Sequence, residues 1–325
     1  MPQTPIPDWH RAHGEPLFTA QLRSAPEDFR VTECLGWEPS GGGEHDFLLI
    51  DKTGANTEWV ARQIARHAAV PAREVGYAGL KDRHAITRQR FSVPRWHAPE
   101  WGDFDAEGVR VVAVTRHRRK LRRGAHRANR FEIVLRHSQA PDREAVRHRL
   151  AMIGEQGVPN YFGEQRFGRG GSNLRLAEDW ARGKRLPRQK RGLAISVVRA
   201  IAFNDALAAR VAAGTWDRFV AGDRANLDGS ASVFDVTDID EELQRRGEAM
   251  DIHPAGTLPG EGAAIAPPHW QAALDRARVR PDTRRLRLPV RDLGTGITPS
   301  AISLCFTLDR GSFATAVLRE LCRWT

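Results

Sequence analysis

Residues 75–91, VGYAGLKDRHAITRQRF, surround a single carboxylate with cations. Asp82 lies shortly after Gly79 and has Lys81 and Arg83 as its neighbours. An ionised carboxylate can act as a nucleophile or as a base, and nearby cations favour its charged form. A loop of surface ion pairs has the same composition. The stretch alone therefore leaves a catalytic acid and an ion-pair loop as alternatives.

Other catalytic patterns are weak in this sequence. The glycine-rich segment 167–173, FGRGGSN, fits neither the Rossmann nor the P-loop spacing, and a tight turn is its simpler interpretation. No GxSxG motif and no second clustered carboxylate occur, which disfavours the common serine hydrolases and two-carboxylate glycosidases. The histidines and the three cysteines (Cys34, Cys305 and Cys322) show no metal-ligand spacing. We expect no metal site.

The positive charge is concentrated in two segments. Residues 110–136 contain ten Lys or Arg and one acid, and residues 180–199 contain seven and no acid. The net charge of the whole chain is only +10, so the remainder is net negative. Focused positive charge is typical of a face that binds a polyanion, although a solvated charged surface gives the same pattern. We expect a nucleic acid as the partner.

Three phenylalanines and one asparagine lie where an unstacked base could bind. Phe29 follows an acidic turn, Phe131 follows Asn129 in the basic segment, and Phe313 follows Gly311 and Ser312. Each ring by itself is more commonly a core residue. Together, an amide for the edge of a base and rings for its face are what a base-binding pocket uses.

The elements that would position these residues come from both ends of the chain. A helix is predicted to begin at residues 56–58, and another spans 313–324. Residues from about 157 to 289 read mainly as helices and turns, including a helix over 194–213. Strand patterns occur at residues 27–33, 47–50, 91–93, 109–115, 130–137 and 302–308. This arrangement predicts one sheet built from both chain ends, with a separate domain inserted into it.

Composition restricts the class of protein. The chain has 325 residues, 41% hydrophobic and 28% charged, as in a soluble globular protein of one large or two ordinary domains. No run of about 18 apolar residues predicts a membrane span. An odd number of cysteines without paired spacing indicates a reduced, cytoplasmic protein.

Several segments resemble the TruD family of tRNA pseudouridine synthases. The signature is Gly79–Gln89, GLKDRHAITRQ, and the other matches follow the family in order over residues 26–315. These matches are PEDFRVTE (26–33), GEH (43–45), KLRRG (120–124), NRF (129–131), GVPNYFGEQRFG (157–168) and GSFAT (311–315).

The resemblance implies an α+β fold: a pseudouridine-synthase catalytic domain with a mixed, largely antiparallel sheet and flanking helices, interrupted by an inserted α/β domain. The implied division is 1–156 and 290–325 for the catalytic domain and 157–289 for the inserted domain. The implied reaction converts uridine to pseudouridine at position 13 of tRNA without cofactor or metal. The partner is tRNA, with no membrane and no obligate protein partner evident.

The resemblance also assigns residues. Asp82 matches the catalytic aspartate, and the positions that contact the target nucleotide are Phe29, Asn129 and Phe313. Phe131 lies in the same Asn-x-Phe motif. Lys81 and Arg23 are the two cations expected near the acid, and either could pair with it. Whether Asp82 acts as nucleophile or base stays open.

Two other functions are compatible with parts of the sequence. A non-catalytic RNA-binding or chaperone protein needs the arginines but not Asp82, so turnover of uridine distinguishes it. A metal-dependent RNA hydrolase needs Asp82 with a metal, and activity that survives a chelator excludes it.

Overall fold

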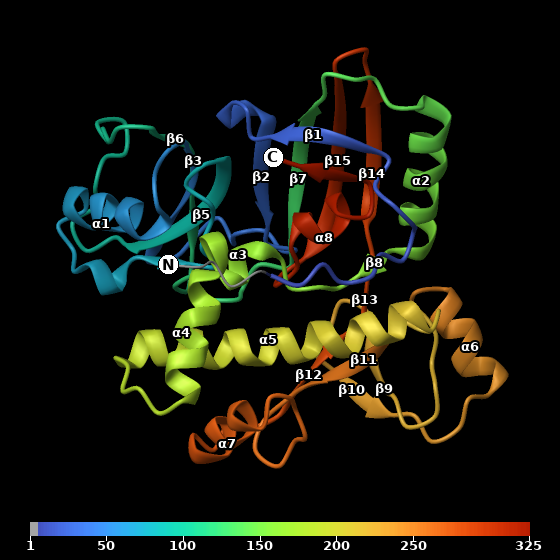
Figure 1. Cartoon of the computed structure of the whole chain (residues 1–325). Coiled ribbons are helices and arrows are strands. Elements are labelled where there is room, and N and C mark those ends of the chain that lie inside the picture. Colours follow the sequence, from blue (N-terminus) through green and yellow to red (C-terminus); the bar gives the residue numbers. More distant parts are fainter. Residues whose placement is uncertain (1–5) are drawn as a thin grey trace. The chain divides into compact units, whose positions relative to one another are not determined.

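A ten-stranded sheet is the largest feature of the computed structural model, which describes residues 6–325 (Figure 1). The first five residues of the predicted N-terminal part therefore lie outside the described residues. Its strands are β1 (Phe18–Leu22), β2 (Phe29–Cys34), β3 (His45–Lys52), β4 (Gly76–Tyr77), β5 (Ile86–Pro94), β6 (Val109–His117), β7 (Ala128–Arg136), β14 (Arg291–Ile297), β15 (Ala301–Asp309) and β16 (Cys322–Trp324). The main path is β14-β15-β7-β2-β5-β3-β6, in which only β2 and β5 are parallel. The sheet is thus mixed and largely antiparallel, as expected.

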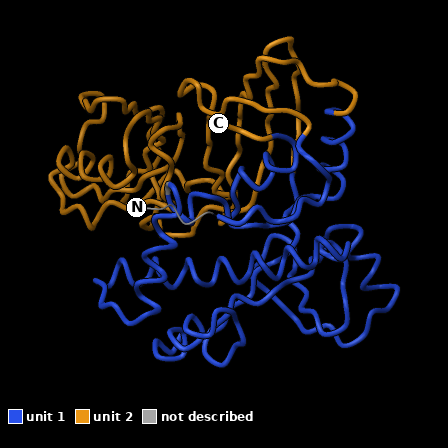
Figure 2. Tube along the Cα trace, in the orientation of Figure 1, with its two compact units in different colours: residues 1–16, 146–290, 312–322 blue, residues 17–145, 291–311, 323–325 orange. Residues whose placement is uncertain are grey.

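The chain divides into two compact units, each assembled from separate segments (Figure 2). Unit 2 contains Leu17–Ala145, Arg291–Gly311 and Arg323–Thr325, and it holds the ten-stranded sheet apart from Cys322. Unit 1 contains the residues up to Pro16, Val146–Val290 and Ser312–Cys322. Both ends of the chain therefore contribute to the large sheet, while the middle of the chain forms most of unit 1.

Alternating side chains give β7 its place in the centre of the sheet. Asn129, Phe131, Ile133 and Leu135 are buried, while the intervening side chains include exposed Arg130 and Glu132 on the opposite face. Helix α1 (Thr57–His67) covers the buried face beside β3 and β5, where Val60 and Ile64 pack with Ile50 and Phe91. Asn56 is the N-cap residue of α1, although its side chain makes no capping hydrogen bond.

Unit 1 contains more strand than the sequence predicts. Its helices are most of α2 (Arg143–Gln156), then α3 (Glu164–Phe167), α4 (Ser172–Ala181), α5 (Arg188–Ala212), α6 (Glu241–Glu248), α7 (Pro268–Arg276) and α8 (Ala314–Leu318). Its strands are β8 (Val158–Pro159), β9 (Arg224–Leu227), β10 (Val233–Asp235), β11 (Ile252–Leu258), β12 (Asp282–Arg285) and β13 (Arg287–Leu288). Four of them form a sheet in the order β10-β9-β11-β12. The expectation of mainly helices and turns was incomplete, because most of these strands are short and none shows a long alternation of apolar and polar residues.

Helix α5 forms the centre of unit 1. Among the described residues it is the one helix with the length and apolar composition of a membrane span, and half of its most apolar window is buried inside the protein. Its buried side chains pack with Trp9, Tyr161 and Phe167 in one cluster. A core helix that is apolar around most of its circumference has the same composition.

The predicted helix over 313–324 is wrong in its second half. Helix α8 ends at Leu318, and Cys322–Trp324 forms β16, which pairs with β1. Cys322 is buried, Arg323 is exposed and Trp324 is partly buried, which is the alternation of a strand. Pairing with β1 stabilises the strand conformation of a segment whose apolar composition suits a helix equally well.

Candidate active site

Asp82 lies on the loop between β4 and β5, and Arg23 is its ionic partner. One carboxylate oxygen, Oδ2, is 2.9 Å from Nη2 of Arg23, and the other accepts a hydrogen bond of 3.0 Å from the backbone N of His84. The side chains of Arg23 and Asp82 are 31% and 33% exposed. The carboxylate is therefore held in place by a cation and still reachable from solvent.

Arg23 also connects Asp82 to an aromatic ring. Its guanidinium carbon lies 4.3 Å from the centroid of the Phe29 ring, which is a cation–π distance. Arg23 has a left-handed backbone with φ of 63°, at the turn after β1. The 3-10 turn η1 (Pro26–Asp28) lies immediately before Phe29, and the side chain of Asp28 holds it in place.

Asp28 fastens this turn to the central strand of the sheet. Its buried carboxylate accepts two hydrogen bonds of 2.8 Å from Arg136 on β7 and one of 3.1 Å from the backbone N of Ala25. The hydrogen bonds from Arg136 lower the pKa of Asp28 below its usual value. Phe29 therefore begins β2 from a turn that is tied down on both sides.

Lys81 points away from Asp82 and into the protein. Its Nζ lies 2.8 Å from Oε2 of Glu33, and the two side chains are 5% and 0% exposed. The other oxygen of Glu33 accepts a hydrogen bond of 3.3 Å from the backbone N of Arg90. Of the two cations that the sequence offered as partners of Asp82, the structure pairs Arg23 with it and uses Lys81 to fasten the loop to β2.

Uncharged groups hold the same loop at further points. The hydroxyl of Thr57, at the start of α1, accepts from the backbone N of Lys81 at 3.0 Å and donates to Gln89 at 3.1 Å. The Gln89 amide donates to the carbonyl of Gly79 at 3.1 Å. The loop is thus attached to both α1 and β5, and its backbone is defined on either side of Asp82.

Lys52, on β3, attaches the backbone of the Asp82 loop to the sheet. Its side chain is buried, and its ammonium donates to the carbonyl oxygens of Ala55 at 2.8 Å and Asp82 at 3.2 Å. Burial lowers the pKa of Lys52 to about 8, against the opposing effect of the Asp82 charge. Sequence reasoning missed both Lys52 and Glu33. The signal for Glu33 was its alternation with Phe29 and Val31, because a carboxylate on a buried strand face requires a buried partner.

Asn129 and Phe131 lie on β7, directly beside these residues. Asn129 is the register partner of Glu33, and Phe131 is that of Val31. The rings of Phe29 and Phe131 meet edge to face with centroids 6.2 Å apart. Asn129 is 8% exposed, and its Oδ1 has no hydrogen-bond partner among the described residues. A buried acceptor without a partner suits a donor supplied by a ligand.

Phe313 belongs to unit 1, whereas the other predicted site residues belong to unit 2. It is the N-cap residue of α8, and its ring is partly buried against the ring of Phe162, with centroids 6.3 Å apart. The guanidinium of Arg166 lies 6.0 Å from the same ring. Within its own unit Phe313 thus lies at the border between core and surface.

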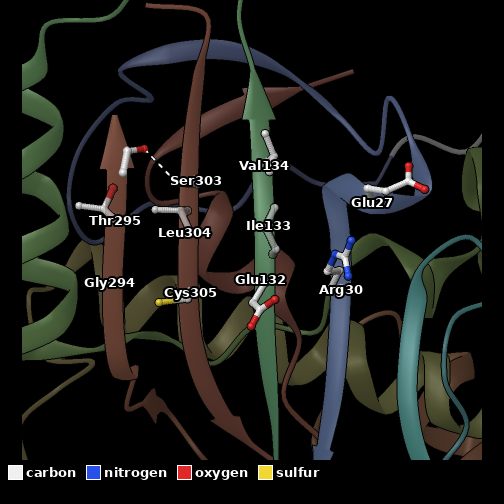
Figure 3. A pocket seen from close by; sticks show the side chains of 11 residues that line it. Glu27, Arg30, Glu132, Ile133, Val134, Gly294, Thr295, Ser303, Leu304 and Cys305 are labelled. Atoms are coloured by element: carbon white, nitrogen blue, oxygen red, sulfur yellow. Dashed lines mark hydrogen bonds between the residues drawn. The ribbon is translucent and has the colours of Figure 1, made fainter. Parts of the chain in front are cut away.

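The open face of the sheet carries a separate pocket of about 500 Å³ (Figure 3). Arg30 and Glu132 line it, and they alternate along their strands with Phe29 and Phe131, so their side chains lie on the face opposite the site residues. Ser303 donates to the carbonyl of Gly296 at 3.2 Å within it. This pocket is not part of the Asp82 site. Among residues 6–325, no three His, Cys, Asp or Glu side chains gather as metal ligands would.

Comparison with known proteins decides the family. The sequence model for "tRNA pseudouridine synthase D (TruD)" matches residues 11–177 and 174–321. The chain belongs to the TruD family. The tRNA pseudouridine synthase D of Methylococcus capsulatus is 47% identical, covering 97% of this chain and 94% of its own length. That of Nitrosococcus oceani is 44% identical, covering 95% and 92%.

A solved structure supports the fold. A Methanosarcina mazei protein assigned as a tRNA pseudouridine synthase D (TruD) superposes with a TM-score of 0.71, covering 96% of this chain and 95% of its own, at 21% identity. At that identity the likeness concerns the fold alone, and it confirms the expected α+β class. The TruD resemblance of the motifs around Asp82, Asn129 and Phe313 thus extends over nearly the whole chain.

Proposed function

We propose that this protein is a tRNA pseudouridine synthase that isomerises uridine at position 13 of tRNA, with Asp82 as its catalytic residue. The observation that supports this role best is the partly exposed Asp82 carboxylate, held by Arg23 beside the ring of Phe29. A tRNA-modifying enzyme of this kind acts in the cytoplasm. We also assign residues 157–289 to the inserted domain of the TruD family.

The reaction needs an ionised acid at the ribose. The bond from C1′ to N1 breaks, the uracil turns, and C5 joins C1′, while the proton on C5 leaves and N1 gains one. Asp82 serves either as nucleophile at C1′ or as base on the sugar, and both roles use the same carboxylate. Arg23 holds this carboxylate in place through its ion pair of 2.9 Å. All atoms of the product come from the substrate and solvent, so the reaction requires no cofactor.

The everted base is held by the residues around Asp82. The rings of Phe29 and Phe131 offer apolar surface, and Oδ1 of Asn129, which has no partner in the described part of the chain, accepts from the N3–H of uracil. Phe313, in unit 1, is the remaining position that the TruD resemblance assigns to contact with the target nucleotide. Lys81 supports the site from inside the protein through Glu33. The exposed arginines of the two basic segments bind the phosphates of the tRNA.

The test is the Asp82→Asn variant, with the exposed Glu132→Gln as a matched control. The substitution keeps the size of the side chain but removes the charge that attacks or deprotonates the sugar. We expect single-turnover pseudouridine formation on a tRNA with uridine at position 13 to fall below detection. Binding of the tRNA should stay the same or tighten, because one negative charge leaves a face that receives phosphates.

Glu132→Gln should retain the rate of the unmodified protein. Appreciable turnover by Asp82→Asn would remove the catalytic role from Asp82. If the unmodified protein binds tRNA but forms no pseudouridine, the alternative of a non-catalytic RNA-binding protein replaces the proposal.

A further inference from the structure

Lys52 is a buried cation that forms no ion pair with any carboxylate of residues 6–325. It lies at the end of β3, is 1% exposed, and among the described residues its ammonium donates only to the carbonyl oxygens of Ala55 and Asp82. Burying a charge is costly unless it is paired and hydrogen-bonded, and an apolar side chain at such a position avoids that cost. The fold alone therefore gives little reason for a lysine at this position.

What distinguishes the position is the atom that Lys52 binds. The Asp82 carbonyl lies on the same residue as the carboxylate paired with Arg23, so the ammonium restrains the backbone on which the acid is mounted. The same ammonium bridges to Ala55, just before α1, and so connects the loop to the rigid part of the sheet. A bridge of this kind limits the rotation of residue 82 relative to β3.

We propose that Lys52 is a positioning residue that holds the backbone of Asp82 in the geometry required for attack on the ribose. This inference rests on the catalytic role of Asp82 proposed above. Lys52 itself is too buried to touch the RNA, so it acts on the rate and not on binding. A displacement of about 1 Å in a reacting group can lower a rate by about 100-fold.

The surroundings of Lys52 predict a particular pH dependence. Asp82 and Lys81, from the loop above, are the charged groups whose fields act on it. On the adjacent strands its register partners are Thr87 and Val109, which carry no charge. Burial lowers the pKa of Lys52 to about 8. The ammonium is therefore charged below that pH, and as the pH rises through about 8 it loses its proton and the bridge weakens.

The experiment compares Lys52→Met and Lys52→Arg with the unmodified protein between pH 6 and 9.5. Lys52→Met should lower the single-turnover rate at pH 7 by about 10- to 100-fold with tRNA binding unchanged. The unmodified protein should lose rate as the pH rises past about 8, and this decline should be absent from the Met variant. Lys52→Arg stays charged over the whole range, so it should recover part of the rate and also lack the decline.

A second measurement separates this inference from the proposed function. The backbone N–H of His84 bonds to the Asp82 carboxylate, and its hydrogen exchange reports the order of the loop whether or not the protein turns over. Exchange should be faster in Lys52→Met and unchanged in Ile64→Val, a core variant of α1 away from the loop. Unaltered exchange of the His84 amide in Lys52→Met, or an alkaline decline that persists in it, would overturn the positioning role. Absence of pseudouridine with the unmodified protein would instead overturn the proposed function.

Discussion

The ammonium of Lys81 lies 2.8 Å from the carboxylate of Glu33, and both side chains are almost fully buried. Lys81 and Asp82 are neighbours in sequence, yet they point to different places: Lys81 into the sheet, and Asp82 towards Arg23 and solvent. One residue of the pair fixes the loop from inside, and the other presents its carboxylate. Lys81, the cation next to Asp82 in sequence, therefore anchors the loop, and Arg23 forms the ion pair with Asp82.

The Glu33–Lys81 pair should be strongly coupled. Removing either partner leaves the other charge buried, so Glu33→Gln and Lys81→Met should each lower the free energy of unfolding by about 3–5 kcal/mol. The double variant should lose much less than the sum, because it leaves no unpaired charge. Urea unfolding of the four proteins measures the coupling, and additive losses would contradict it.

Arg23 should contribute to the reaction rate through its charge and through the planar contact of its guanidinium with the Phe29 ring. Arg23→Met removes a charge-assisted contact worth about 1.5–3 kcal/mol, so the pseudouridine-forming rate should fall about 10- to 100-fold. Arg23→Lys keeps the charge but loses the planar contact with Phe29, worth about 0.5–1 kcal/mol, and should fall only a few-fold. Single-turnover rates at saturating enzyme distinguish the two. Equal rates for both variants would show that the charge of Arg23 contributes nothing, since only the lysine variant keeps it.

The base-holding residues should affect the rate more than binding. Phe29→Ala, Asn129→Ala and Phe313→Ala each change a position that the TruD resemblance assigns to nucleotide contact, and stacking is worth about 1–3 kcal/mol per base. That is a small share of an affinity dominated by phosphates. Thermal unfolding must be measured alongside. If Phe313→Ala unfolds the protein, its ring is a core residue packed on Phe162 and the nucleotide contact is wrong.

The basic segment between β6 and β7 should set the salt dependence of tRNA binding. Arg118, Arg119 and Arg122 are exposed, and none forms an ion pair with any residue from 6 to 325. Replacing all three by Gln should weaken binding and flatten the plot of log affinity against log salt by about 2–3, since fewer counterions are released. Arg123 is left in place because it binds the hydroxyl of Tyr77.

A control triple variant tests whether net charge alone explains the result. Arg224, Arg245 and Arg246 are each paired with an acid, Asp235, Glu242 and Asp251 respectively. Replacing these three arginines removes the same charge from compensated positions. In this control, the slope of log tRNA affinity against log salt should stay close to that of the unmodified protein. If the slope flattens as much as in the first triple variant, residues 118–122 have no specific role in binding.

The Asp28–Arg136 contact should contribute to stability in a pH-dependent way. Hydrogen bonds from Arg136 hold the pKa of Asp28 below its unfolded value of about 3.9. The stabilisation is therefore fully present above about pH 4 and is lost as the pH falls through the lower folded pKa. Asp28→Asn should be less stable at pH 7, and its difference from the unmodified protein should shrink towards pH 3. Urea unfolding across this range checks the sign, and a constant difference would contradict it.

The sequence predicted the parts of the site that repeat a local pattern. Apolar alternation in 130–137 predicts the strand that contains Phe131, and the TruD motif by itself singles out Asp82. The sequence could not show whether Arg23 or Lys81 forms the ion pair with Asp82. Neighbouring side chains on a loop can point apart, and Arg23 is distant from Asp82 in sequence. The role of Lys52 could not be predicted either, because its hydrogen-bond partners are backbone carbonyl oxygens, which every residue type carries. Strands β9, β10 and β12 were missed because each has only three or four residues, too few for a pattern, and their stability comes from pairing with neighbouring strands.

The position of β15 has a consequence for how the protein is made. β15 pairs with β7 along its whole length, and Leu308 is the register partner of Asn129. During synthesis, the edge of β7 stays open until residues 301–309 have left the ribosome, although Asp82 and Asn129 were made much earlier. An open apolar strand edge is a template for pairing with other chains. The nascent chain therefore needs protection from aggregation while residues 137–300 are being made, and any fragment that ends before residue 301 should precipitate instead of keeping a partly working site.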